Sequence, residues 1–169
     1  MHVPAQQSTP NPSGRTATSK YFARRPVVFA ALAAITAFVP PFLVLALMQD
    51  LLPQPQASVF HPVVAAMGLL LLAPVVETLL MVPMMAIAER LFRSEHAAVV
   101  ASAVAWAGLH TMSAPAKPFI AFWGFVVLGY TFVYWRRERP HSFLWIVMLA
   151  HGFTNTPSAL VTVWTGLSR

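Results

Sequence analysis

The sequence predicts an all-α membrane protein, a multi-pass bundle of about five transmembrane helices. Hydrophobic residues make up 57% of the chain and charged residues only 9%, whereas a soluble domain carries about 25% charged residues. The mean hydropathy is +0.65. At 169 residues the chain has the size of one domain. It has no cysteine, so disulfides, thiolate metal sites and cysteine nucleophiles are excluded.

Five apolar stretches approach the length of about 20 residues that a helix needs to cross a bilayer, although the third and fourth are short. They are expected at residues 27–48, 63–88, 97–112, 119–135 and 142–166. Residues 1–24 form a polar tail, rich in Pro, Ser and Thr, which is expected to be disordered. The helical membrane domain is expected over 25–169.

The loop charges predict the orientation. Nine of the eleven Lys and Arg residues precede the first stretch or lie in the loops after the second and the fourth. They are Arg15, Lys20, Arg24, Arg25, Arg90, Arg93, Arg136, Arg137 and Arg139. Because basic loops stay in the cytoplasm, the tail is expected inside and the C-terminus outside. The net charge of +6 is spread over short clusters, so we expect no nucleic-acid partner.

Four polar residues interrupt three of the apolar stretches: Glu77, His110, His151 and Asn155. An ionisable side chain at mid-bilayer costs about 3 kcal/mol on insertion scales, so such residues are functional candidates. Counted from the cytoplasmic loops, Glu77, His110 and His151 lie at depths of about 18, 21 and 15 Å at 1.5 Å per residue. One layer could therefore hold them all in a shared polar site.

Helical spacing predicts which faces meet. In the fifth stretch, His151, Thr154, Asn155 and Ser158 form one polar stripe that is expected to face the bundle interior. In the third stretch, one face is expected to carry polar and aromatic residues and another only small residues, which would let a neighbouring helix approach. The first comprises Ser102, Trp106 and His110, and the second Ala97, Ala101, Ala105 and Gly108.

Two prolines, Pro74 and Pro83, flank Glu77 in the second stretch. Each removes a backbone N–H and can kink the helix. The carbonyl groups released in this way must be paired by protein or water inside a membrane, which suits a polar cavity.

The chemistry of the four polar residues fits hydrolysis of a peptide bond. Such a reaction needs an activated water and a group that stabilises the developing oxyanion. Glu77 is the only carboxylate deep in a stretch, which makes it the best general base. His110 could hold the same water. His151 and Asn155, one turn apart, could donate hydrogen bonds to the oxyanion.

Three short motifs give the chain a family resemblance. They are Glu77-Thr-Leu-Leu-Met-Val82 after Ala73-Pro74, Trp106-Ala-Gly-Leu-His110, and His151-Gly-Phe-Thr-Asn155. Their order resembles the CAAX-processing and bacteriocin-processing intramembrane proteases, also called the CPBP, Abi or Rce1-like family. That family shows Glu-Glu-x-x-x-Arg, Phe-x-x-x-His and His-x-x-x-Asn, each on a transmembrane helix. The resemblance places the protease-like core at about residues 63–166.

The chain departs from the family pattern at three positions. Thr78 stands where the second Glu is usual, Val82 where the Arg is usual, and Trp106 where the Phe is usual. Loss of the second Glu together with the Arg could remove one internal charge pair as a unit and leave Glu77 intact. Thr78, Trp106 and Thr154 are expected to support the site.

The resemblance implies a glutamate-dependent intramembrane endopeptidase of the bacterial inner membrane, which is CAAX-processing-like and acts on a membrane-anchored protein or peptide without a metal cofactor. A zinc site formed by Glu77, His110 and His151 is the mechanistic alternative. Two functional alternatives also stay open. One is an inactive relative that binds a partner for immunity or assembly, and the other is a small proton-linked transport component.

Overall fold

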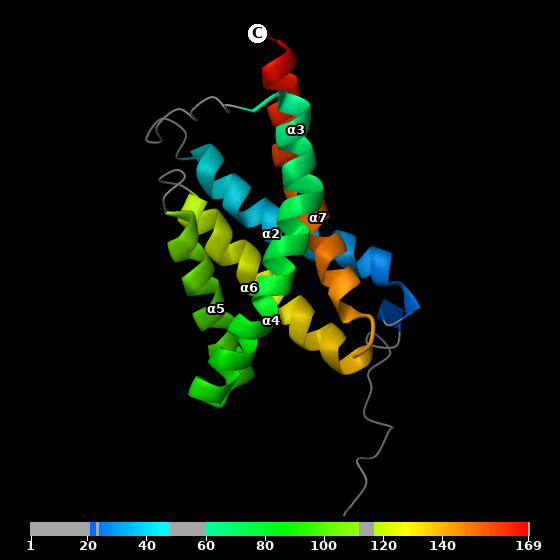
Figure 1. The fold of residues 1–169 in the computed structure, drawn as a ribbon, viewed down its shortest axis with the longest axis vertical. Coiled ribbons are helices and arrows are strands. Elements are labelled where there is room, and N and C mark those ends of the chain that lie inside the picture. Colours follow the sequence, from blue (N-terminus) through cyan, green and yellow to red (C-terminus); the bar gives the residue numbers. More distant parts are fainter. Residues whose placement is uncertain (1–20, 23, 48–59, 112–116, 169) are drawn as a thin grey trace, which may run out of the picture.

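The computed structural model describes residues 21–22, 24–47, 60–111 and 117–168. These residues are helical or lie in short turns, and none of them forms a strand. Five long helices result if α3, η3 and α4, which run on without a break, are counted as one (Figure 1). The helices are α2 (Pro26–Leu47), α3 (Pro62–Met67), the π-helical η3 (Gly68–Leu72), α4 (Ala73–Phe92), α5 (Glu95–His110), α6 (Lys117–Glu138) and α7 (Phe143–Leu167). The all-α prediction is confirmed.

Three of the helices are long and apolar enough to cross a membrane: Pro26–Leu47, Pro62–Phe92 and Lys117–Glu138. Helix α5 has only 16 residues, and α7 is not among the three. Five helices thus lie close to the five predicted stretches, but membrane crossing by α5 and α7 stays a prediction, as does the orientation. Most of the tail predicted over 1–24 lies outside the described residues.

Helices α4 and α5 form an antiparallel hairpin. Arg93 ends α4 in the left-handed region, with φ of 52°, and its N–H donates to the carbonyl of Glu89 over 3.0 Å. Ser94 then begins α5, where its side-chain oxygen accepts the N–H of Ala97 over 3.4 Å. A left-handed C-cap followed at once by a serine N-cap reverses the chain within two residues.

One end of the bundle gathers the basic clusters. Arg136 at the end of α6 forms two hydrogen bonds of 2.6 and 3.1 Å with Glu89 near the end of α4, and Arg137 pairs with Glu95 at the start of α5. Near the start of α2, the Phe29 ring stacks on Tyr134 at 5.2 Å. The described residues of the three basic clusters therefore lie toward one end, as the predicted alternation of loops requires.

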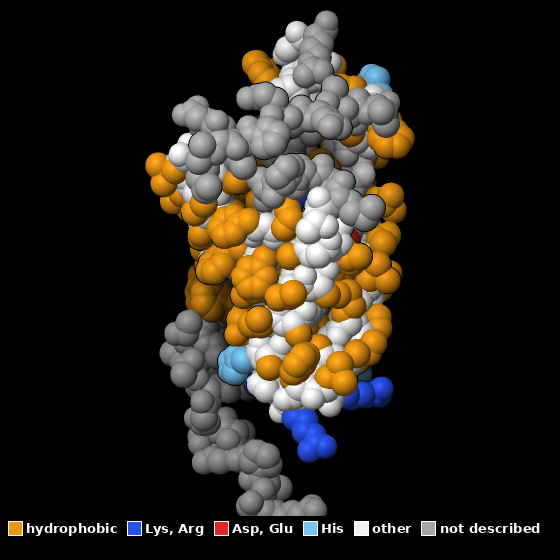
Figure 2. Space-filling view, turned by 90° about the vertical axis from the view of Figure 1, so that its left-hand side faces the viewer, with side chains coloured by type: hydrophobic (Ala, Val, Ile, Leu, Met, Phe, Trp, Pro, Cys, Tyr) orange, Lys and Arg blue, Asp and Glu red, His pale blue; other side chains and the backbone are white. Residues whose placement is uncertain are grey.

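The interior and the outer surface of the bundle are both apolar. Helix α4 buries one stripe, Pro74, Thr78, Met81, Met85 and Ala88. Large apolar side chains are exposed over much of the outside, and on the face shown in Figure 2 they are spread over the helices with backbone and other side chains between them. Such a surface is too large for an ordinary soluble monomer, and it suits contact with lipid.

The predicted small-residue face of α5 is wrong in its outer half. Ala105 and Gly108 are exposed, and nothing lies within 4 Å of a Cβ placed on Gly108. The face of α5 that packs against the bundle is instead the one that includes Val99 and Trp106. The close approach of a neighbouring helix occurs on this face, at Val99. A Cβ on Gly129 of α6 would lie 2.9 Å from Cγ1 of Val99.

We predict that Gly129→Ala lowers the free energy of unfolding by about 1–3 kcal/mol, because the added methyl overpacks the α5–α6 contact. Gly124→Ala is the matched control, since it lies in the same helix and has nothing within 4 Å of its Cβ position. The intrinsic gain in helix propensity is the same in both. Thermal unfolding in detergent measures the stability of both variants. An equal gain in stability for Gly129→Ala and Gly124→Ala would contradict the prediction.

Candidate functional site

The central contact of the site joins α4 to α7. Oε2 of Glu77 lies 3.4 Å from Nε2 of His151. The His151 side chain is 6% exposed and that of Glu77 21% exposed, so the pair is mostly screened from the surroundings. A carboxylate this far inside an apolar bundle requires a nearby partner of opposite or switchable charge, and the imidazole supplies it.

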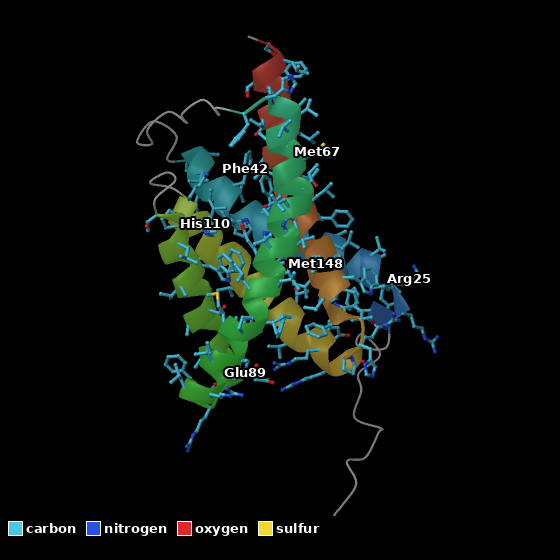
Figure 3. All side chains as sticks on the ribbon, viewed as in Figure 1. Arg25, Phe42, Met67, Glu89, His110 and Met148 are labelled. Carbon is cyan, nitrogen blue, oxygen red and sulfur yellow. The ribbon has the colours of Figure 1, made fainter. Side chains whose placement is uncertain are left out.

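His110 lies at the level of Glu77 because of the α4–α5 hairpin. Glu77 precedes Arg93 by 16 residues, and His110 follows Ser94 by 16. His110 is close enough to interact electrostatically with both Glu77 and His151. Figure 3 shows His110 on the last turn of α5, far from Glu89 at the hairpin end. Nδ1 of His110 lies 2.8 Å from the carbonyl oxygen of Trp106. A carbonyl only accepts, so Nδ1 carries the hydrogen and Nε2 of the neutral ring is the acceptor.

An aromatic residue of α6 lies between the two histidines. The Phe125 ring stacks on Trp106 at 4.4 Å with an angle of 5° between the planes. It meets His151 edge-on at 5.6 Å and lies 6.0 Å from His110. Phe125 thus forms an apolar wall of the site. Sequence reasoning missed it, because it is one of several aromatic residues in an apolar stretch and no motif marks it.

The polar stripe of α7 only partly faces inward. His151 is buried and Asn155 is half-buried, while Ser158 is exposed, which corrects the prediction at its far end. The Asn155 side-chain amide donates to the carbonyl of Leu69 in η3 over 2.9 Å. The Thr154 hydroxyl donates to the carbonyl of Ala150 in its own helix, also over 2.9 Å.

Three buried polar atoms at or beside these residues have no hydrogen-bond partner in the described part of the chain. They are Oγ1 of Thr78, Nε1 of Trp106 and Nδ1 of His151. Each unpaired buried group costs about 1–3 kcal/mol, so such groups mark places that bind water or a ligand. Thr78 is fully buried on the interior stripe of α4. The position of the family's second Glu therefore holds a neutral group, which needs no partner Arg.

The zinc alternative requires Glu77, His110 and His151 to converge on one point. Within the described ranges, no three His, Cys, Asp or Glu side chains are arranged to hold a metal ion. Metal dependence stays a prediction to be tested in solution.

A shallow groove of about 440 Å³ lies between the helices that carry Glu77 and His151, but neither of these two residues lines it. It runs between the α4 and α7 segments that carry the two residues, and its lining, which includes Leu71, Val75 and Phe153, is almost wholly apolar. A second groove of about 700 Å³, between α2, α5 and α6, is larger. None of the four predicted polar residues lines either groove. The smaller groove is the nearer one along the chain, because its lining includes Val75, two residues before Glu77, and Gly152, next to His151.

The fold and the site together define a class: a helical integral membrane protein with a Glu–His pair inside its bundle. The family of type II CAAX prenyl endopeptidases, Rce1-like, matches residues 59–157, which is more than half of the chain. The protein belongs to this family of CAAX-type intramembrane proteases. No curated protein and no solved structure matches the chain.

The family's usual Phe at position 106 suggests a test of the aromatic wall. We predict that Trp106→Phe keeps the stack on Phe125, removes an unpaired buried N–H and leaves stability unchanged or raised. Trp106→Ala deletes the stack and should cost about 3 kcal/mol. Thermal unfolding of the two variants in detergent measures the difference. Equal destabilisation by both would show that the indole nitrogen has a necessary partner.

Proposed function

We propose that this protein is a glutamate-dependent intramembrane endopeptidase of the bacterial cytoplasmic membrane. The contact between Glu77 and His151 carries the proposal, since it unites two of the family's motif positions at 3.4 Å inside the bundle. His110, the third motif position, is level with them. A carboxylate flanked by two imidazoles has the groups that water activation requires.

The reaction begins when Glu77 takes a proton from a bound water. The water oxygen forms a bond to the scissile carbonyl carbon, and the carbonyl oxygen becomes an oxyanion. His110 accepts a hydrogen bond from the water through Nε2 and orients it. His151, whose Nε2 lies beside the carboxylate, donates to the oxyanion. The tetrahedral intermediate collapses, the C–N bond breaks, and Glu77 returns the proton to the leaving nitrogen.

The substrate is a membrane-anchored protein or peptide. The apolar groove between the helices that carry Glu77 and His151 supports this class, because an apolar anchor can lie in it on the same two helices that hold the site. The Phe125 ring meets His151 edge-on, and this apolar wall limits the entry of water. Exclusion of water strengthens the electrostatic interactions of the site.

We predict that Glu77→Gln lowers cleavage of a membrane-anchored test peptide by at least about 100-fold, because the amide cannot take the proton from water. His110→Ala should also lower the turnover rate, since the water loses its acceptor. Reconstituted protein and mass spectrometry of the products measure both effects.

Glu89→Gln is the matched control. It removes a carboxylate from the same helix but at the hairpin end, where Glu89 pairs with Arg136, and should leave turnover near the wild-type rate. Wild-type rates in Glu77→Gln and His110→Ala would overturn the proposal. Partner binding without turnover in any variant would instead identify a binding protein, and Glu77-dependent proton flux in vesicles a transport component.

Metal removal gives a separate prediction. Cleavage should persist after dialysis against a strong chelator, because Glu77 and His110 activate the water without a metal ion in the proposed reaction. The rate is measured before and after dialysis and again after zinc is added. Loss of activity on chelation and its return with zinc would establish the zinc mechanism.

A further inference from the structure

Pro74 leaves a specific gap in the hydrogen bonding of the helix that carries Glu77. In the π-helical segment η3, the N–H of Ala73 donates to the carbonyl of Gly68, five residues earlier. The next bond in this pattern would run from residue 74 to the carbonyl of Leu69. Proline has no N–H, so the backbone cannot supply it. An unpaired carbonyl inside a membrane is costly.

Asn155 of α7 fills this gap. Its side-chain Nδ2 donates to the carbonyl oxygen of Leu69 over 2.9 Å, and thus replaces the N–H that Pro74 lacks. Helix α7 and the η3 segment approach each other closely at this level. A Cβ added to Gly152 would lie only 3.3 Å from the carbonyl oxygen of Leu70. The bond therefore joins α7 to the bulged turn that leads directly into Pro74 and Glu77.

We propose that Asn155 is a positioning residue that closes the backbone gap made by Pro74 and thereby holds Glu77 against His151. His151 precedes Asn155 by one turn on the same helix, and Glu77 follows Pro74 by three residues. Two contacts consequently fix the register of the continuous helix Pro62–Phe92 against α7: Glu77 with His151, and Leu69 with Asn155. The catalytic consequence rests on the proposed protease function, but the structural link does not.

The competing role for Asn155 is a hydrogen bond to the oxyanion. The two roles differ in their dependence on Pro74. Pro74→Ala restores a backbone N–H that can pair with the freed carbonyl, so it should relieve the need for Asn155. An oxyanion donor would stay necessary whatever residue occupies position 74, and its loss would cost about 10²–10³-fold in kcat.

The test is a double-mutant cycle with Asn155→Ala and Pro74→Ala in the full-length protein. Thermal unfolding in detergent measures the coupling without reference to activity, and peptide cleavage measures it in kcat. We expect Asn155→Ala to reduce the folding equilibrium constant about tenfold and kcat at least tenfold in the wild-type background. Both losses should shrink to less than about threefold in the Pro74→Ala background.

Pro83→Ala is the matched control, since Pro83 lies inside the same helix α4 but nine residues beyond Pro74. It restores a different N–H and should not rescue Asn155→Ala. If Asn155→Ala does not give folded protein, Asn155→Leu replaces it in the cycle, because leucine fills a similar volume without a donor.

The outcomes separate the two proposals. Equal losses of stability from Asn155→Ala in both backgrounds would overturn the positioning role, whatever the protein catalyses. Rescue of stability without rescue of kcat would assign Asn155 to the oxyanion and overturn the catalytic part of the inference. Coupled stability in a protein that cleaves nothing would keep the structural link and reject the protease function.

Discussion

A bilayer offers no water to an unpaired backbone group, and this constraint governs the region around Glu77. The helix from Pro62 to Phe92 is interrupted by a π-helical segment and then by Pro74, where the regular ladder of backbone bonds cannot continue. The carbonyl of Leu69 is paired by Asn155 from another helix. An interruption that would weaken an isolated helix thus becomes a link between the two helices that carry Glu77 and His151.

The same contact explains why the polar stripe of α7 faces the interior for only part of its length. His151 and Asn155 meet α4 and η3 in turn, and Gly152 between them allows the close approach. Beyond this region the hydroxyl of Thr162 pairs with the carbonyl of Ser158 in its own helix, and Ser158 itself is exposed. Polar side chains that satisfy their own helix need no interior partner.

Sequence reasoning could find the helices and the polar site because both depend on patterns of side chains. Long apolar stretches predict the helices, and Glu77, His110 and His151 are conspicuous exceptions within them. The partner of Asn155 could not be predicted, because a main-chain carbonyl leaves no trace in the sequence. The packing face of α5 was partly misassigned for a related reason. Ala and Gly are frequent all round that helix, so small size alone cannot distinguish Gly108, which is exposed, from Ala103, which is buried.

The departures from the family motif form one coherent change. A buried Glu–Arg pair gains little net stability, since desolvation offsets the attraction, whereas removal of one partner leaves an expensive isolated charge. Here both are absent together: Thr78 is fully buried and neutral, and Val82 is apolar. Removal of the pair as a unit avoids the large penalty and leaves Glu77 as the one carboxylate of the site among the residues that the structure describes. The partner of the Glu77 carboxylate is then the His151 imidazole, 3.4 Å away on another helix, and not a guanidinium of its own helix.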